Sequence, residues 1–153
     1  MQIRIASPDE SEKIALVMRE AFAEFESFYT PEAFAVTIPD AGKICERFDE
    51  GAVWAALKNE KLVGTVSTVA DNEKLYIRSM AVLPSAQNLG IGRKLLEAIE
   101  KYAVENGYNC LFLYTTPFLA GAIQLYEQSG FKRGDDIPGF FGTPRFAMEK
   151  KLK

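Results

Sequence analysis

Histidine is absent from all 153 residues of this chain. That absence excludes a catalytic triad, a metal site or a general base that depends on an imidazole. Cysteine is scarce, with only Cys45 in a predicted helix and Cys110 in a predicted buried strand. In a reducing compartment both are expected to be free thiols, and neither lies in a recognisable nucleophile motif. The sequence therefore predicts no metal site and no covalent enzyme intermediate.

The chain also has no apolar run near the roughly 18 residues that cross a bilayer. Its first residues, MQIRIASPDE, contain no apolar signal core. The net charge is −3, and the only basic cluster is Lys150-Lys151-Leu152-Lys153. We expect a cytoplasmic protein that binds neither a membrane nor, as its main partner, a nucleic acid.

What is present is the composition of a folded globular protein, with 48% hydrophobic and 25% charged residues. The length fits a single domain over 1–153 that buries a core without disulfides or metals. No internal repeat or low-complexity tract interrupts it. We therefore interpret the whole chain as one folding unit.

The most informative stretch runs from Leu75 to Phe131. LYIRSMAVLP (75–84) predicts a strand, QNLGIG (87–92) a short loop, and RKLLEAIEKYAVENG (93–107) a helix. The first turn of such a helix has free backbone N–H groups and the positive end of the dipole, so it favours an anion. Gly90 and Gly92 remove Cβ atoms there, and Arg93 and Lys94 add positive charge. A dinucleotide fingerprint is excluded because Leu95 stands where its third glycine would be. A P-loop is excluded because it needs four residues between its glycines, followed by Lys-Ser/Thr, and this pattern is absent.

The remaining segments predict alternating strands and helices. Ser7 and Glu10 form a capping-box pattern before an amphipathic helix whose face carries Ile14, Val17, Met18, Ala21, Phe22 and Phe25. Residues 26–40 have no clear periodicity and predict loop and short helix. The expected strands are at 2–5, 51–57, 61–70, 109–116, 131–135 and 145–152. One helix is expected at 40–48, and another is expected to open at Thr116 and Pro117 and to run through AGAIQLYEQSGF (120–131). An irregular loop at 137–143 either lies over a site or faces solvent.

QNLGIG, preceded by Val82 and Pro84, resembles the phosphate-binding signature of the GNAT N-acetyltransferase superfamily, Gln/Arg-x-x-Gly-x-Gly/Ala. The strand NCLFLYTT (109–116) and the helix AGAIQLYEQSGF (120–131) resemble the family's next element, so two ordered motifs agree over residues 61 to 135. The resemblance implies an α/β (α+β) fold in one domain. It has a mixed sheet of six to seven strands, mostly antiparallel, with a central parallel pair at 75–84 and 109–116, and about four helices.

The implied function is transfer of an acetyl group from acetyl-CoA to a primary amine, directly within a ternary complex. The family pattern implies that backbone groups of Met80 and Val82 bind the pantetheine and the acetyl carbonyl. It implies that Tyr126 protonates the leaving thiolate; the alternative is that Tyr126 is one more aromatic on a buried face. The residues expected to hold the diphosphate are Gln87, Asn88, Leu89, Gly90, Ile91, Gly92 and Arg93.

The chain departs from the family pattern at two positions. Leu119 stands where many members have an asparagine, and Tyr76 stands where some have a glutamate base. Deprotonation of the amine is then left to water with a carboxylate, for which the candidates are Glu24, Glu26 and Glu46, or to solvent. A second function stays open, that of a non-catalytic sensor or subunit that binds acyl-CoA.

The acceptor is expected to be a small-molecule or protein amine, and a homodimer is possible. Tyr29, Tyr76 and Arg78 are candidate substrate contacts, and Phe28 and Phe34 are either pocket lining or core. Strand alternation predicts that Tyr76, Arg78, Met80 and Val82 share one face. On that face Arg78 would bind a carboxylate or phosphate of the substrate, or else pair with Glu73.

Overall fold

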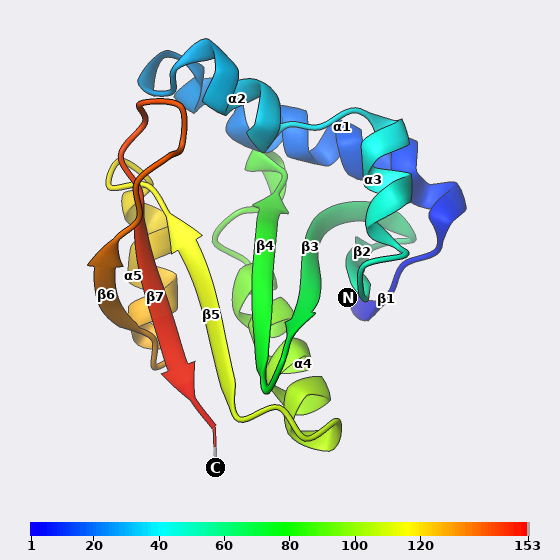
Figure 1. Ribbon diagram of the computed structural model, residues 1–153. Helices are drawn as coiled ribbons and strands as arrows, with labels where there is room; N and C mark the ends of the chain where they lie inside the picture. Colours follow the sequence, from blue (N-terminus) through cyan, green and yellow to red (C-terminus); the bar gives the residue numbers. More distant parts are fainter. Residues whose placement is uncertain (153) are drawn as a thin grey trace.

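The computed structural model describes residues 1–152, which form one sheet with helices on both of its faces (Figure 1). The strand order is β1-β2-β3-β4-β5-β7-β6, and within these residues only β4 and β5 pair in parallel. The predicted mixed sheet with a central parallel pair is therefore confirmed. The strands are β1 (Gln2–Ile5), β2 (Val53–Lys58), β3 (Lys61–Asp71), β4 (Lys74–Val82), β5 (Cys110–Thr115), β6 (Lys132–Asp136) and β7 (Phe146–Lys151).

The described residues contain five α-helices, which are the four or so expected and the short helix predicted within 26–40. That short helix is α2. Thr30 caps it, because its hydroxyl accepts a hydrogen bond from the N–H of Ala33. The helices are α1 (Ser11–Phe22), α2 (Pro31–Thr37), α3 (Ala41–Arg47), α4 (Ile91–Glu105) and α5 (Ala120–Gln128), with short 3-10 turns at Pro8–Glu10, Ala23–Phe28 and Pro84–Ala86.

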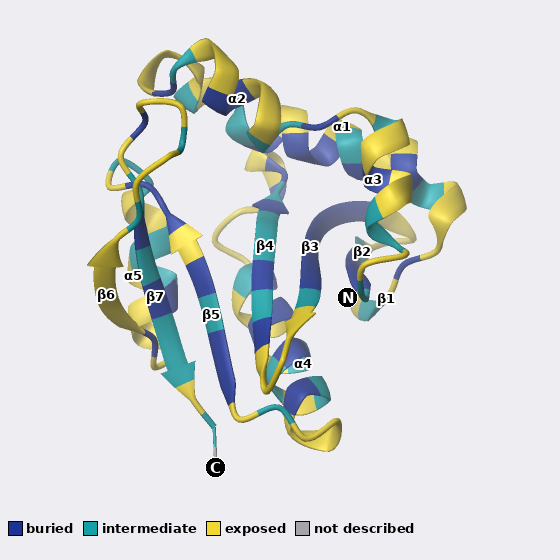
Figure 2. Cartoon of the chain, viewed as in Figure 1, coloured by how far each residue is buried: buried dark blue, intermediate teal, exposed yellow. Residues whose placement is uncertain are grey.

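Helix α1 packs on the sheet through the apolar face that the sequence predicted. Its buried residues include Ile14, Val17, Met18 and Ala21, and they lie against β3 and β4 (Figure 2). The capping box of Ser7 and Glu10 is present in the turn that leads into the helix. This layer covers one face of the sheet.

Helix α4 covers the other face of the sheet. Leu95, Ile99 and Ala103 are completely buried along one side of it, as the 3.6-residue spacing predicted. Tyr102 of the same helix meets Trp54 of β2 edge-on, with ring centroids 5.5 Å apart. Among residues 1–152, none of the helices combines the length and apolar character needed to cross a membrane.

Helix α5 begins later than the sequence indicated. Thr116 and Pro117 were expected to open it, but residues 116–119 form a turn closed by a bond from the Leu119 N–H to the Thr116 carbonyl, and the helix starts at Ala120. The turn places Phe118 against Tyr29, 4.8 Å between ring centroids, in a small second core. The reason is long-range packing, which no local pattern encodes.

Candidate active site

A cleft opens where β4 and β5 separate. The two strands pair only over Lys74–Tyr76 and Cys110–Phe112, and then diverge (Figure 1). The cleft between them has a volume of about 690 Å³ and is lined from α1, α2, α4, α5 and the loop before β7. Beyond Tyr76 the edge of β4 that faces β5 has no partner strand among the described residues. Its backbone groups are therefore available to an extended ligand.

A β-bulge in β4 changes which face of the sheet its side chains point to along the cleft. Thr65 of β3 lies opposite Ala81 and Ser67 lies opposite Arg78, so β4 has one residue more than its partner between these pairs. Ser79, in the bulge, has φ 61°. As a result Arg78 shares a face with Ser67, whereas Val82 shares the opposite face with Gly64.

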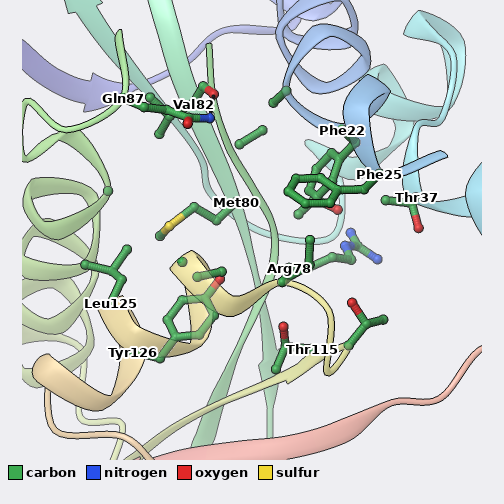
Figure 3. A pocket seen from close by; sticks show the side chains of 18 of the residues that line it. Phe22, Phe25, Thr37, Arg78, Met80, Val82, Gln87, Thr115, Leu125 and Tyr126 are labelled. Atoms are coloured by element: carbon green, nitrogen blue, oxygen red, sulfur yellow. Dashed lines mark hydrogen bonds between the residues drawn. The ribbon is translucent and has the colours of Figure 1, made fainter. Parts of the chain in front are cut away.

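The prediction that Tyr76, Arg78, Met80 and Val82 share one face is therefore wrong. Strand alternation holds for Tyr76 and Arg78, but the bulge reverses it for Val82. All four still line the cleft, because the cleft passes through the opening in the sheet. Figure 3 shows Met80 pointing toward Leu125 and Arg78 pointing toward the side where Phe25 and Thr37 lie.

The loop before α4 has the expected form of an anion site. Within residues 1–152, the backbone N–H groups of residues 88–93 donate no hydrogen bond to the protein. Gly90 caps α4 with φ 78°, and a Cβ placed on it would meet nothing within 4 Å. The Gln87 side chain donates to the Val82 carbonyl at 3.3 Å and so fixes the loop to the end of β4.

Gly92 lines the cleft, and it also has a role in packing that was not expected. A Cβ at this position would lie 2.8 Å from Cδ2 of Leu125, so the glycine lets α4 and α5 approach each other closely. Of the seven residues of the predicted diphosphate loop, Leu89 does not line the cleft, and its side chain is 48% exposed. Arg93 lines the cleft and pairs with Glu97 at 3.4 Å.

Tyr126 lies on α5 with its side chain buried and pointing into the cleft (Figure 3). Burial raises the pKa of its phenol well above the ordinary value, and the neighbouring Tyr29 raises it further. The phenol therefore stays protonated near neutral pH. Leu119, in the position that the sequence singled out as a departure, also lines the cleft.

The other candidate contacts fall in different places. Tyr29 lines the cleft, but Phe28 is 59% exposed and Phe34 packs behind Tyr29, so neither is pocket lining. Of the three acids considered as a base, only Glu24 reaches the cleft. The alternative for Arg78, that it pairs with a nearby acid such as Glu73, holds for a different acid: Arg78 pairs with Glu50 at 3.4 Å, while Glu73 accepts from Asn109.

Sequence reasoning missed two arginines of this cleft, Arg47 and Arg145. Arg47 ends α3 and donates to the Ser79 hydroxyl at 2.9 Å. Arg145 precedes β7, and its guanidinium lies 4.8 Å from the ring centre of Tyr114 and 4.6 Å from that of Phe140. The position of Arg145 between a Gly/Phe-rich loop and a strand was a weak sequence signal for a cleft residue. Nothing in the sequence around Arg47 indicated that it would line the cleft.

The loop at 137–143 contributes to the site, which decides between its two readings. Phe140 lines the cleft, while Phe141 is 53% exposed. The loop is held to the start of α2 by two bonds: the Thr30 hydroxyl donates to the Phe141 carbonyl at 2.8 Å, and the Thr143 hydroxyl accepts from the Thr30 N–H at 3.0 Å. The loop and α2 thus meet at one end of the cleft (Figure 1).

Comparison with known proteins finds a consistent set of relatives. The sequence model of the acetyltransferase (GNAT) family matches residues 14–131. The uncharacterized N-acetyltransferase YhfO of Bacillus subtilis is 29% identical over 141 residues, 86% of this chain and 90% of that protein. The probable N-acetyltransferase camello of Xenopus tropicalis is 35% identical over 89 residues, and here the match spans 56% of this chain but only 40% of the relative.

Solved structures give the same fold. The PaiA N-acetyltransferase of Thermoplasma acidophilum in complex with coenzyme A superposes with a TM-score of 0.86 at 22% identity, over 99% of this chain and 98% of that one. The putative acetyltransferase YncA of Salmonella typhimurium with acetyl-CoA gives a TM-score of 0.79 at 20% identity, over 100% and 94% of the two chains. At such identities the likeness establishes the fold.

Proposed function

Because this chain belongs to the acetyltransferase (GNAT) family, we propose that it transfers an acetyl group from acetyl-CoA to a primary amine. The observation that carries the proposal is the cleft itself. It brings together the free N–H groups of the loop before α4, the unpaired edge of β4 and the phenol of Tyr126. Each of these supplies one of the functions that acetyl transfer requires.

The residues present fit coenzyme A. The free N–H groups of residues 88–93 and the positive end of α4 would hold its diphosphate, with open space above Gly90 for the approach. The unpaired backbone of β4 around Met80 and Val82 would bind the extended pantetheine as a further strand would. When bound, acetyl-CoA supplies the activated acetyl thioester.

The chain's own groups position the acceptor amine and move the protons. The amine nitrogen attacks the acetyl carbonyl, the C–N bond forms, and the C–S bond breaks as the thiolate leaves. Tyr126 would give its phenolic proton to that sulfur, since burial keeps the phenol protonated. Within residues 1–152, no acid other than Glu24 lines the cleft, and it would accept the amine's proton through water.

A strong base is not required at this site. Three guanidinium groups, from Arg47, Arg78 and Arg145, line the cleft. Nearby positive charge disfavours an ammonium ion and so lowers the pKa of a bound amine. The neutral amine, which is the nucleophile, is then more populated than it would be in water.

The first test is calorimetric titration of the purified protein with acetyl-CoA. We expect binding in the micromolar range, a free energy of about −8 kcal/mol. Gly90→Asp should abolish binding, because its carboxylate would stand beside the diphosphate. Gly90→Asn is the matched control, since it has the same size and also tolerates φ 78°, but carries no charge.

Three results would contradict the proposal or part of it. Absence of acetyl-CoA binding by the folded protein would remove its basis. Binding that Gly90→Asp leaves unchanged would place the diphosphate elsewhere. Binding without acetylation of any amine in a broad panel would favour the alternative of a non-catalytic acyl-CoA sensor, against which the buried, cleft-facing Tyr126 argues.

A further inference from the structure

We propose that the acceptor amine carries an anionic group, a carboxylate or a phosphate, which Arg47, Arg78 and Arg145 bind. The inference rests on the proposed function, because it names the acceptor class of the same cleft. The three side chains come from the end of α3, the middle of β4 and the residue before β7. All three line the cleft.

The positive charges of these three arginines are not balanced by acidic side chains. Arg78 has a partner in Glu50, but the contact is long, at 3.4 Å, and the Glu50 side chain is 47% exposed. Neither Arg47 nor Arg145 forms an ion pair within the described part of the chain. The local positive charge contrasts with the net charge of −3 on the whole protein. A bound anion would balance it.

Two of the guanidinium groups have donors without partners. The Nε atoms of Arg78 and Arg145 are both buried and make no hydrogen bond to residues 1–152. A buried donor left unpaired costs free energy, and guanidinium groups match the planar oxygens of a carboxylate or phosphate. Both side chains line the cleft, where the rest of each guanidinium group can meet such an anion.

Contacts connect the three guanidinium groups across the cleft. Arg47 donates to Ser79, the residue after Arg78, and Tyr76 meets the ring of Tyr114 with 5.3 Å between centroids, where Arg145 lies over that same ring. Burial and then the charge of Arg78 lower the pKa of Arg47 to about 10, against the opposing charge of Glu50. Burial raises the pKa of Tyr76, while the charges of Arg78, Arg145 and Arg47 each oppose that rise.

The cluster is held in place before any ligand arrives. Arg145 lies over the rings of Tyr114 and Phe140, and its carbonyl accepts from the Ile137 N–H at 2.8 Å. Arg47 is fixed by its bond to Ser79. Fixed donors lose little entropy on binding, which favours recognition of a specific anion. The same cations repel a polyamine or another polycationic acceptor.

The test compares acceptors that differ only in the anion. The common L-amino acids are assayed with acetyl-CoA against their α-carboxamides, O-phosphoethanolamine against ethanolamine, and spermidine as a polycation. The value of kcat/KM is calculated on the concentration of neutral amine, because the amine pKa differs within each pair. We expect an anionic amine to exceed its neutral partner by about tenfold or more. The amino acid and phosphate arms identify which anion is preferred.

Variants connect this preference to the arginines. Arg78→Gln and Arg145→Gln should lower kcat/KM for the anionic amine by about 10- to 100-fold and that for its neutral partner by clearly less, so that the anionic preference falls by about tenfold. Arg19→Gln is the charge-matched control, because Arg19 is exposed on α1 and does not line the cleft. Acetyl-CoA affinity, measured in parallel, should be unchanged in all three variants.

The outcomes are distinguishable. If acetyl-CoA binds, and neutral amines or spermidine are acetylated with a kcat/KM equal to that of the anionic amines, the acceptor inference is overturned while the proposed function stands. The same holds if both arginine variants leave the anionic preference intact. If acetyl-CoA binds and no amine reacts, the proposed transfer fails, and the inference fails with it.

Discussion

The Arg47 guanidinium donates a hydrogen bond of 2.9 Å to the Ser79 hydroxyl, which joins the end of α3 to the bulge of β4. Ser79 has φ 61°, a conformation that costs a non-glycine residue about 1–2 kcal/mol. The two residues are 32 positions apart in the chain. A contact between distant segments therefore helps to hold both the bulge and one guanidinium group of the cleft.

Ser79→Ala should weaken acceptor binding without changing acetyl-CoA binding. The change removes the hydroxyl that positions Arg47 and lowers the free energy of unfolding by about 1 kcal/mol. We expect the KM of the acceptor to rise several-fold while the Kd of acetyl-CoA stays within about twofold. Ser79→Gly is the control: it loses the same bond but relieves the backbone, so it should give the same KM with less loss of stability. Equal effects on both ligands would refute this division of the cleft.

Gly92→Ala should disturb coenzyme binding more than folding. Its new Cβ would lie 2.8 Å from Leu125, a flexible side chain at the cleft wall, which must move. Calorimetry should show a several-fold higher Kd for acetyl-CoA, with the free energy of unfolding changed by less than about 1 kcal/mol. Adding Leu125→Ala should recover the affinity of the Leu125→Ala single variant. If the double variant binds no better than Gly92→Ala alone, the contact with Leu125 is not the cause.

Tyr126→Phe should lower kcat by about 100-fold with little change in either KM, because it removes the proton donor and keeps the ring. Burial raises the pKa of Tyr126 above 10, so the acid form persists and this residue should cause no fall in wild-type kcat below pH 10. Tyr102→Phe, on the face of α4 that meets Trp54, is the matched control. A kcat within twofold of the wild type would assign Tyr126 to packing with Phe131 instead.

Glu10→Gln should destabilise the fold in a way that depends on pH. Both Glu10 oxygens accept from Arg4 at 2.8 Å, and this pairing lowers the pKa of Glu10 from 4.5 to about 2. A lowered pKa stabilises the fold above the ordinary value, and that stabilisation is lost as the pH falls through 4.5 toward 2. Urea titrations should show a deficit of about 1–2 kcal/mol at pH 7 that disappears near pH 2.

Arg4→Gln and the double variant complete the cycle for this ion pair. Each single change should cost about as much as the double change, because either one removes the same pair. A Glu10→Gln deficit that stays constant between pH 7 and pH 2 would show that the pair contributes nothing through the charge of Glu10. The site should be unaffected in all three variants, since neither residue lines the cleft.

The local pattern of the sequence determined much of the framework. The strand, loop and helix around QNLGIG follow from a proline, two glycines and a 3.6-residue apolar spacing, and all three elements were predicted correctly within two residues at most ends. Tyr126 was found in the same way, because it falls at a fixed place in a second motif. These features depend on residues that are near one another in the chain.

Tertiary structure alone decided the rest. The bulge at Ser79 adds one residue to β4 relative to β3, so the side chain of Val82 lies on the opposite face from the one that simple alternation predicts. Gly92 serves the packing of α4 on α5, which depends on Leu125 more than thirty residues later. Arg47, Arg78 and Arg145 meet only because β4 and β5 separate and the packing of α3 and the last loop brings them to the opening. The sequence by itself determined the glycine-containing loop before α4 and the place of Tyr126 on α5, whereas long-range packing determined which arginines line the cleft.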